Sequence, residues 1–168
     1  VLIARIAIKI NKTKFAKKIL LEVVKKYPKS WDGHRFLAEV YEKEGGMRKA
    51  IDEYVRAVDL NKKDYDSYYR ISFLLNELGQ KDDAKGMLET LLSKRPEYIN
   101  ATILLGDIYW DKGEYKEALN TYLNGMKYAP NDYDLLYSIG MAYTMLNDFQ
   151  NAKIYYEKEA EINNLLFK

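Results

Sequence analysis

The chain has 168 residues, with 27 Lys and Arg against 25 Asp and Glu, a net charge of +2, and no cysteine. The lack of cysteine excludes disulfide bonds and thiolate metal sites. The near-neutral balance argues against nucleic acid or an anionic membrane as a partner, and no apolar run approaches the roughly 18 residues of a membrane span. No signal peptide is visible, so we expect a cytoplasmic protein.

A pattern with a period of 34 residues runs through the sequence. It is marked by five alanines, Ala16, Ala50, Ala84, Ala118 and Ala152. All three prolines, Pro28, Pro96 and Pro130, follow an alanine of this set by 12 residues. Midway between the alanines lie Asn11, Gly45, Gly79, Gly113 and Asn147. A fixed period between about 20 and 50 residues is typical of proteins that stack helical units.

The period divides the chain into five units, which we expect to form a single array over residues 1–168. They span about 1–30, 31–64, 65–98, 99–132 and 133–166, and the first is incomplete. The first unit is predicted to hold helices over Val1–Ile10 and Thr13–Lys26, and the second over Trp31–Glu44 and Met47–Leu60. Each later unit repeats this hairpin with a short turn. Val1 is not a Met and falls at position 5 of a unit, so we expect a piece of a longer protein.

Within each unit, apolar and small residues recur at helical spacing. Numbering each unit from 1, positions 7, 8 and 11 lie on one face of the first helix, as in Leu105, Gly106 and Tyr109. Positions 20, 24, 27 and 28 likewise carry apolar and small residues on one face of the second helix. Gly or Asn at position 15 supplies a left-handed residue that ends the first helix. Pro at position 32 ends the second.

This combination of period, small residues, aromatics, Gly and Pro resembles the tetratricopeptide repeat (TPR) family. The resemblance implies an all-α, right-handed solenoid of antiparallel helix hairpins. It also implies a non-enzymatic scaffold for protein–protein interaction. One departure is at position 4, where the family favours Trp and this chain has His34, Tyr68, Thr102 and Leu136.

No constellation of catalytic or metal-binding residues is visible. The only histidine, His34, occupies a packing position, so we interpret it as structural rather than as a general base. Asp82 and Asp83 stand near the start of a helix, where acidic residues are stabilising. The sequence therefore predicts no catalytic residue, no metal and no cofactor.

A second face of the first helices is predicted to meet a partner. In TPR proteins, positions 2, 5, 9, 12 and 13 line the concave groove. In units three to five these positions combine apolar side chains with acidic ones, a pattern that favours a protein or peptide carrying Lys or Arg and apolar anchors. The predicted groove residues are Asp66, Tyr69, Phe73, Asn76, Glu77, Ile103, Asp107, Trp110, Asp111, Asp134, Tyr137, Met141 and Met145.

Two other interpretations of these residues remain open. The side chains can pack against the neighbouring unit, an objection that applies most to Trp110 at the edge of the core. A downstream segment of a longer chain can also fold back into the groove. One family subtype is disfavoured: the clamp for a C-terminal carboxylate needs Lys and Asn where this chain has Arg35 and Glu39, and its other positions also fail.

Three alternative functions also remain. The first is self-association, because the truncated first helix and the apolar residues 165–167 leave both ends of the array uncovered. The second is a regulatory arm of a larger enzyme. The third, RNA binding by a related helical repeat, is opposed by the near-neutral charge and the acidic groove.

Overall fold

A computed structural model describes residues 1–166 of the chain, and the side chains of residues 1–163. This part is all-helical and contains no strand. Its helices are α1 (Leu2–Lys9), α2 (Thr13–Lys26), α3 (Trp31–Lys43), α4 (Met47–Leu60), α5 (Tyr65–Glu77), α6 (Lys81–Lys94), α7 (Ile99–Asp111), α8 (Tyr115–Met126), α9 (Tyr133–Met145) and α10 (Phe149–Leu166). The all-α hairpin fold expected from the repeat is confirmed, and the four helices predicted for the first two units match within one residue at each end.

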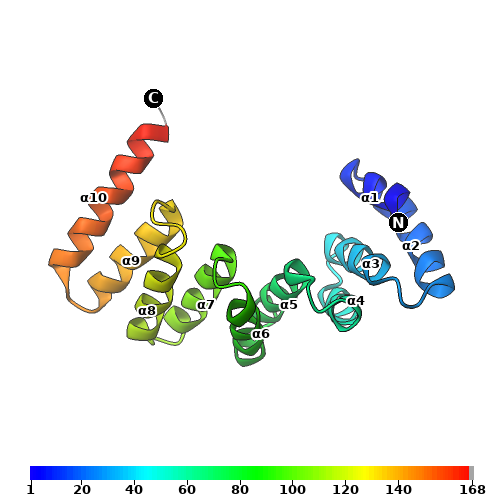
Figure 1. The fold of residues 1–168 in the computed structure, drawn as a ribbon, viewed down its shortest axis with the longest axis horizontal. Coiled ribbons are helices and arrows are strands. Elements are labelled where there is room, and N and C mark those ends of the chain that lie inside the picture. The colour runs from blue at the N-terminus through cyan, green and yellow to red at the C-terminus, as the bar shows by residue number, and fades with distance from the viewer. Residues whose placement is uncertain (167–168) are drawn as a thin grey trace. The chain divides into compact units, whose positions relative to one another are not determined.

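Within each compact part of the chain, helices that are neighbours in sequence pack against one another, α1 to α5 in one part and α7 to α10 in the other (Figure 1). Within the predicted units, α1 packs on α2, α3 on α4, α7 on α8, and α9 on α10. Between units, the first helix packs on the preceding second helix, as α3 does on α2, α5 on α4 and α9 on α8. The helices group into two compact units, Val1–Met87 and a second one that begins at Leu88, inside α6.

Each hairpin turn contains one residue with a left-handed backbone, at the predicted position. Gly45, Gly79 and Gly113 have φ angles of 77°, 76° and 75°. Asn11 and Asn147 have φ angles of 58° and 60°. Glycine and asparagine adopt this conformation at the lowest cost, and it ends the first helix of each pair.

The small residues of the repeat allow the helices to approach closely. A Cβ atom built on Gly106 would lie 2.1 Å from the ring of Tyr122, and one on Gly140 would lie 2.7 Å from the ring of Tyr156. All five periodic alanines are buried. The pairing of a small residue at position 8 with an aromatic ring at position 24 thus sets the spacing within the last two hairpins.

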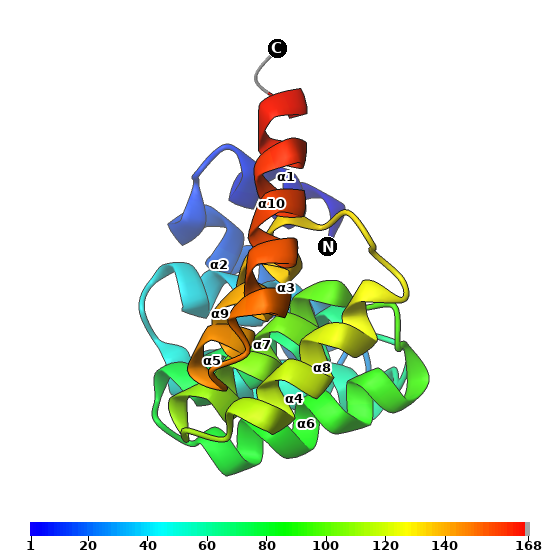
Figure 2. The ribbon, with the colours of Figure 1, turned by 90° about the vertical axis from the view of Figure 1, so that its left-hand side faces the viewer.

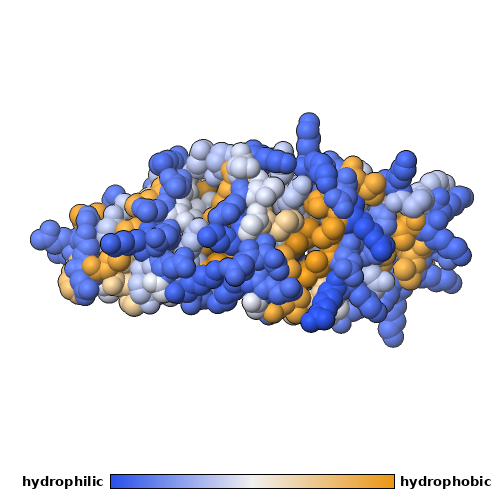
Figure 3. Space-filling model, turned by 90° about the horizontal axis from the view of Figure 1, so that it is seen from below, coloured by the Kyte–Doolittle hydropathy of each residue, from blue (hydrophilic) through white to orange (hydrophobic). Residues whose placement is uncertain are grey.

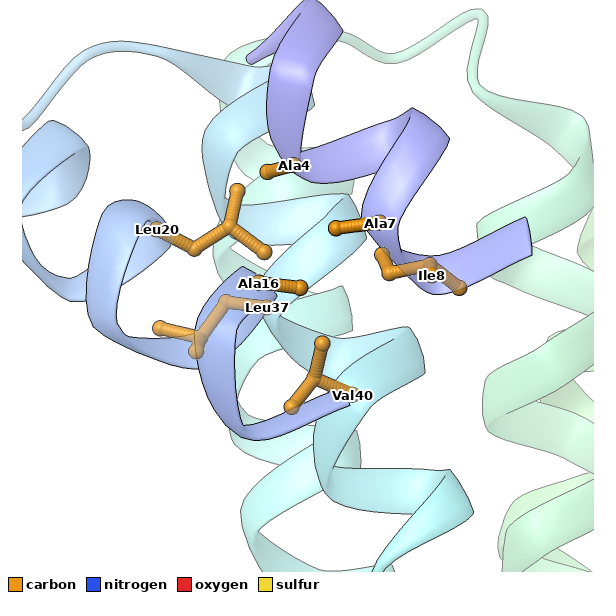
Figure 4. Packing of buried hydrophobic residues seen from close by; sticks show 7 residues of the cluster. All are labelled: Ala4, Ala7, Ile8, Ala16, Leu20, Leu37 and Val40. Carbon is orange, nitrogen blue, oxygen red and sulfur yellow. The ribbon is translucent and has the colours of Figure 1, made fainter. Parts of the chain in front are cut away.

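The core of the first compact unit shows how three helices share one cluster. Ala4, Ala7 and Ile8 of α1 meet Ala16 and Leu20 of α2, and Leu37 and Val40 of α3 complete the cluster (Figure 4). An equivalent cluster in the second compact unit joins α8 to α9 through Ala118, Tyr122 and Ile139.

The last helix is longer than its neighbours. α10 has 18 residues against 13 in α9, and its C-terminal part extends beyond α9 (Figures 1 and 2). Of the apolar residues 165–167 named above, the side chains of 165 and 166 and the whole of residue 167 lie outside the described part of the structure.

Candidate functional site

The predicted groove residues fall into two sets, one in each compact unit. The first set is Asp66, Tyr69, Phe73, Asn76 and Glu77; together with Arg35, Glu42 and Arg70, which the structure adds through their ion pairs, we call it the α3–α5 face. We call the second set the α7–α9 face; it comprises Ile103, Asp107, Trp110, Asp111, Asp134, Tyr137, Met141 and Met145.

On the α3–α5 face, arginines are bonded to the acidic side chains. Arg35 Nη2 lies 3.0 Å from Asp66 Oδ2, and the same guanidinium lies 3.4 Å from Asp64. Arg70 forms an ion pair with Glu42, in which its Nε donates a hydrogen bond of 3.1 Å to Glu42 Oε2. Much of the negative charge expected here is therefore neutralised within the protein.

On α5, the ring of Phe73 is also contacted by an arginine, whereas the amide oxygen of Asn76 lacks a partner among the described residues. The guanidinium of Arg70 lies 5.2 Å from the centre of the Phe73 ring, a distance at which a cation is attracted to an aromatic face. Asn76 is half-buried, and its Oδ1 atom accepts no hydrogen bond from the residues that the structure describes. Tyr69 is half-buried, whereas Glu77 is exposed.

The α7–α9 face has a different composition. Neither α7 nor α9 contains a Lys or Arg. Asp107, Asp111 and Asp134 are exposed, as are the apolar side chains of Tyr137, at 47%, and Met145, at 45%. This set thus combines exposed apolar and acidic groups on α7 and α9, and the carboxylates of Asp107 and Asp134 are close enough to interact electrostatically.

The remaining apolar members of the α7–α9 face are anchored in the fold. Ile103 and Trp110 are half-buried and pack against the hydrophobic cluster of α8 and α9. The indole of Trp110 also meets the ring of Tyr115 edge-on, with 5.0 Å between ring centres. Ile103 and Trp110 therefore serve the packing between repeats and still present part of their surface. Met141 is half-buried as well.

A buried tyrosine, Tyr122, forms a hydrogen bond from the core to one of the aspartates of the α7–α9 face. The Tyr122 hydroxyl donates a hydrogen bond of 2.7 Å to Asp107 Oδ1. Burial, together with this bond, raises the pKa of Tyr122 above its ordinary range, so the hydroxyl keeps its proton and remains a donor. The ring packs directly against Gly106, so the hydroxyl that holds the Asp107 carboxylate is itself held by the helix contact.

The charges of this face also act on one another. Partial desolvation raises the pKa of Asp107, and the neighbouring carboxylates of Asp111 and Asp134 raise it further, while the Tyr122 hydrogen bond lowers it. The net shift is upward. A cation placed among these carboxylates would relieve their mutual repulsion, so the face is electrostatically suited to a Lys or Arg side chain.

The sequence interpretation did not anticipate the role of the position-24 tyrosines, which it assigned to the core alone. The Tyr54 hydroxyl donates to Glu42 at 3.1 Å, just as that of Tyr122 donates to Asp107. The Tyr156 hydroxyl lies 3.4 Å from that of Thr144. The signal was present, because a polar residue stands at position 9 or 12 of each of these units.

His34 is buried, as the sequence interpretation expected. Its Nδ1 lies 2.6 Å from Glu53 Oε2, and its Nε2 lies 3.1 Å from the carbonyl oxygen of Pro28. Glu53 also accepts from Arg56 at 2.9 Å. Both ring nitrogens are thus used in joining α3 to α4 and to the preceding turn, which is a structural role.

Two further properties concern ligands and membranes. In the part of the chain that the structure describes, no group of three or more His, Cys, Asp or Glu is arranged to hold a metal ion. No helix among the described residues combines the length and the apolar character needed to cross a membrane.

The chain is similar to known repeat proteins along most of its length. A TPR repeat model matches residues 106–147, and two tetratricopeptide repeat models match residues 1–30 with 66–98 and residues 133–164. BBSome complex member BBS4 of Bos taurus is 29% identical over 64% of this chain and 21% of that protein. Hsp70-Hsp90 organizing protein 1 of Glycine max is 27% identical over 83% of this chain and 24% of that protein. The chain thus spans about a quarter or less of these relatives.

Solved structures share the fold. A crystal structure of MamA superposes with a TM-score of 0.89 at 22% identity, covering 96% of this chain and 95% of that one. The structure of YrrB, described as a TPR protein with an unusual peptide-binding site, has a TM-score of 0.78 at 18% identity, covering 95% and 82%. At these identities the likeness concerns the fold. Together with the matching repeat models and the periodic packing, it shows that the chain belongs to the tetratricopeptide repeat family.

Proposed function

We propose that the protein is a protein–protein interaction scaffold and that its α7–α9 face binds a peptide or helix segment of a partner. The observation that carries this proposal is the combination of exposed apolar and acidic side chains on two helices that contain no Lys or Arg. The partner segment would carry apolar anchors flanked by Lys or Arg.

The apolar part of the face is suited to adaptable contact. Tyr137 offers a large rigid surface, and its ring lies 6.1 Å from that of Tyr156, which supports it from α10. Met145 adds a flexible side chain of the kind found at surfaces that accept different partners. Exposed apolar residues are common on protein surfaces. Figure 3 shows several separate apolar patches among hydrophilic side chains on one side of this molecule. Apolar exposure by itself therefore does not single out one binding face.

Charge therefore decides the choice of partner. Asp107 is held by Tyr122, and no ion pair involves Asp107 or Asp134 within the described residues. A basic segment would gain from these carboxylates, whereas an acidic segment or a free C-terminal carboxylate would be repelled. The same argument disfavours the carboxylate clamp, whose basic residues this chain lacks.

The similarities support the general part of the proposal. YrrB is described as having a peptide-binding site, and the relatives from Glycine max and Bos taurus are named as an organizing protein and a member of a complex. We infer that this chain also holds partner proteins, and that its acidic and apolar α7–α9 face gives it a specificity of its own.

The experiment uses the fluorescence of Trp110. The chain has two tryptophans, so Trp31→Phe leaves Trp110 as the only one. We would titrate this variant with an amphipathic peptide that carries leucines beside lysines and has both termini blocked. We expect a saturable change in emission, and at least about tenfold weaker binding when each lysine is replaced by glutamate.

Substitutions on the face locate the binding. Tyr137→Ala combined with Met145→Ala should weaken the lysine peptide by at least about tenfold, because both exposed anchors are lost. Tyr128→Ala, which removes an equally exposed tyrosine outside the face, should leave binding unchanged. Equal binding of the lysine and glutamate peptides, or an undiminished response in the double variant, would refute the proposal.

A further inference from the structure

The outer side of α2 carries an apolar row that the repeat does not require. Phe15, Ile19 and Val23 follow one another at steps of four residues, so they lie along one side of the helix, and Tyr27 continues the row just beyond its end. Phe15 is 53% exposed and Tyr27 is 57% exposed. These side chains line a shallow recess. We call this surface the α2 face; it comprises Phe15, Lys18, Ile19, Glu22, Val23, Lys26 and Tyr27.

The same side of the other second helices is polar. At position 19 of the repeat, where α2 has Phe15, the later units have Lys49, Asp83, Glu117 and Asn151. In α4 and α8, each of which has a further hairpin before it in the chain, positions 19, 22 and 26 are also exposed; these residues are Lys49, Asp52, Arg56, Glu117, Asn120 and Asn124. The exposure of the α2 face therefore does not arise from its place early in the chain. What distinguishes α2 is that an exposed residue on this side is apolar.

The α2 face lies in a strongly basic part of the chain. Residues 12–29 contain a single acidic residue, Glu22, and seven lysines, although the whole chain has a net charge of only +2. Of these lysines, only Lys17 has an ion pair among the described residues, with Glu44 at 2.6 Å. Lys18 and Lys26 are exposed and line the recess itself. Their positive charge is therefore available to a ligand.

The aromatic and the charged groups of the α2 face lie next to each other. The ammonium group of Lys26 is 5.5 Å from the centre of the Tyr27 ring, a distance at which the ring attracts the cation and holds it at the edge of the recess. Ile19 also packs against the hydrophobic cluster of α1, α2 and α3, so the apolar row rests on the core. A ligand would thus meet an apolar surface and positive charge within one short stretch of helix.

We propose that the α2 face binds an acidic segment of a partner protein. An apolar side chain of the segment would lie against Phe15, Ile19 and Tyr27, and its carboxylates would lie beside Lys18 and Lys26. A nucleic-acid backbone is attracted by the lysines alone, and a lipid surface accepts protruding apolar side chains rather than filling a recess. An acidic segment with an apolar anchor uses both features of the face.

This site is separate from the α7–α9 face and does not depend on the partner binding proposed above. The α7–α9 face lies in the other compact unit and has the opposite charge. Each face therefore selects against the ligand of the other, because like charges repel. The scaffold would accept two classes of partner that cannot exchange places.

The binding test uses a dye-labelled peptide that carries leucines beside glutamates. Its fluorescence anisotropy should rise in a saturable way as the 168-residue chain is added, and added salt should weaken the binding. Replacing every glutamate by glutamine should weaken binding at least about tenfold, and so should replacing every leucine by alanine. The first peptide tests the charge of the ligand and the second tests its apolar anchor.

Substitutions locate the peptide on the α2 face. Lys18→Glu with Lys26→Glu should weaken binding at least about tenfold, whereas Lys116→Glu with Lys127→Glu, which reverses two exposed lysines elsewhere, should have little effect. Phe15→Ala should weaken binding at least about fivefold, and Phe149→Ala, which removes a phenylalanine that is 62% exposed, should not. Glu22→Gln removes the one acidic group of the recess and should strengthen binding about twofold, a gain that a loss of folding cannot produce.

Four results would overturn the proposal. The first is the absence of saturable binding by the wild-type chain. The second is binding that the substitutions of Lys18, Lys26 and Phe15 leave unchanged. The third is tighter binding of phosphatidylserine vesicles or single-stranded DNA than of the peptide, which would assign the α2 face to that ligand. The fourth is self-association that the lysine reversals abolish, which would assign it to a second copy of the chain.

Discussion

The α3–α5 face and the α7–α9 face are built on equivalent helices of the repeat, and they differ in how their acidic side chains are neutralised. On the first, Arg35 and Arg70 meet Asp66 and Glu42 through ion pairs inside the protein. On the second, Asp107 and its acidic neighbours lie on helices that have no basic residue. The difference shows that one scaffold can neutralise the acidic side chains of one face internally and place those of another on helices without basic residues; this is why we propose the second face as the binding face.

The two faces rest on helix contacts that are equivalent in the repeat, each built around a buried alanine. Substitution of these alanines should have the largest effect on stability. Ala50 and Ala118 are both 0% exposed. Replacing either by Arg would bury a charge and overpack the helix contact, at a cost above about 4 kcal/mol. We expect thermal scans to show a large decrease in melting temperature for Ala118→Arg and a similar decrease for Ala50→Arg. The exposed Lys116→Ala should change the melting temperature little; equal effects of all three would contradict the repeat register.

A smaller decrease in stability should follow from Gly106→Ala on α7, the helix that carries Asp107. The added Cβ would lie 2.1 Å from the Tyr122 ring, which must move and carry its hydroxyl away from Asp107. We expect a loss of about 1–3 kcal/mol in unfolding free energy, measured by denaturant titration. Gly86→Ala, in an open helical position, is the matched control and should be neutral or stabilising by up to about 1 kcal/mol. Equal losses would show that Tyr122 is not fixed by the glycine.

Removing the arginines should make the two faces more alike. Arg35→Gln with Arg70→Gln uncovers the carboxylates of Asp66 and Glu42 and the ring of Phe73. We expect the lysine peptide to gain a second, weaker site on α5, visible as new chemical-shift changes in NMR spectra, at a stability cost of about 1 kcal/mol. Unchanged spectra at α5 would show that neutralisation is not what separates the faces.

The smallest effect concerns pH. Because the pKa of Asp107 is raised in the folded protein, the folded chain holds more protons on this group than the unfolded chain between the two pKa values, and stability falls as pH rises through the raised one. Asp107→Asn keeps an acceptor for Tyr122 and should stabilise the protein at neutral pH by less than about 1 kcal/mol. The gain should vanish below the ordinary aspartate pKa of 3.8. Thermal scans at a series of pH values, with the exposed Glu117→Gln as control, measure this stabilisation. A stabilisation by Asp107→Asn that grows as the pH is lowered would contradict an upward pKa shift of Asp107.

The periodic pattern predicted the scaffold closely. Steps of 34 residues placed the buried alanines, the left-handed turn residues and the small residues under Tyr122 and Tyr156, since each depends only on the geometry within one unit. The predicted groove residues, which exclude Arg35, Glu42 and Arg70, were chosen by the same helical spacing. Their part in partner binding stays a prediction.

The contacts between units were not predictable from that pattern. The pairing of Arg35 with Asp66, and of Arg70 with Glu42, depends on how far one unit rotates against the next and on the rotamers of long side chains. The hydroxyls of Tyr54 and Tyr122 reach carboxylates within their own units, and there the sequence contains a polar residue at the right position but does not give the rotamer that completes the hydrogen bond. The periodicity of one sequence gives neither the rotation between units nor the rotamers of these side chains.

The left-handed turn residues have a practical consequence for building on this protein. A Cβ added at Gly45, Gly79 or Gly113 would meet nothing within 4 Å, so backbone strain alone opposes a side chain there. Asparagine reduces that strain, and the chain already uses it at Asn11 and Asn147. The inner turns therefore offer positions where a label or a short graft can be introduced through an asparagine-type turn without meeting a neighbouring side chain.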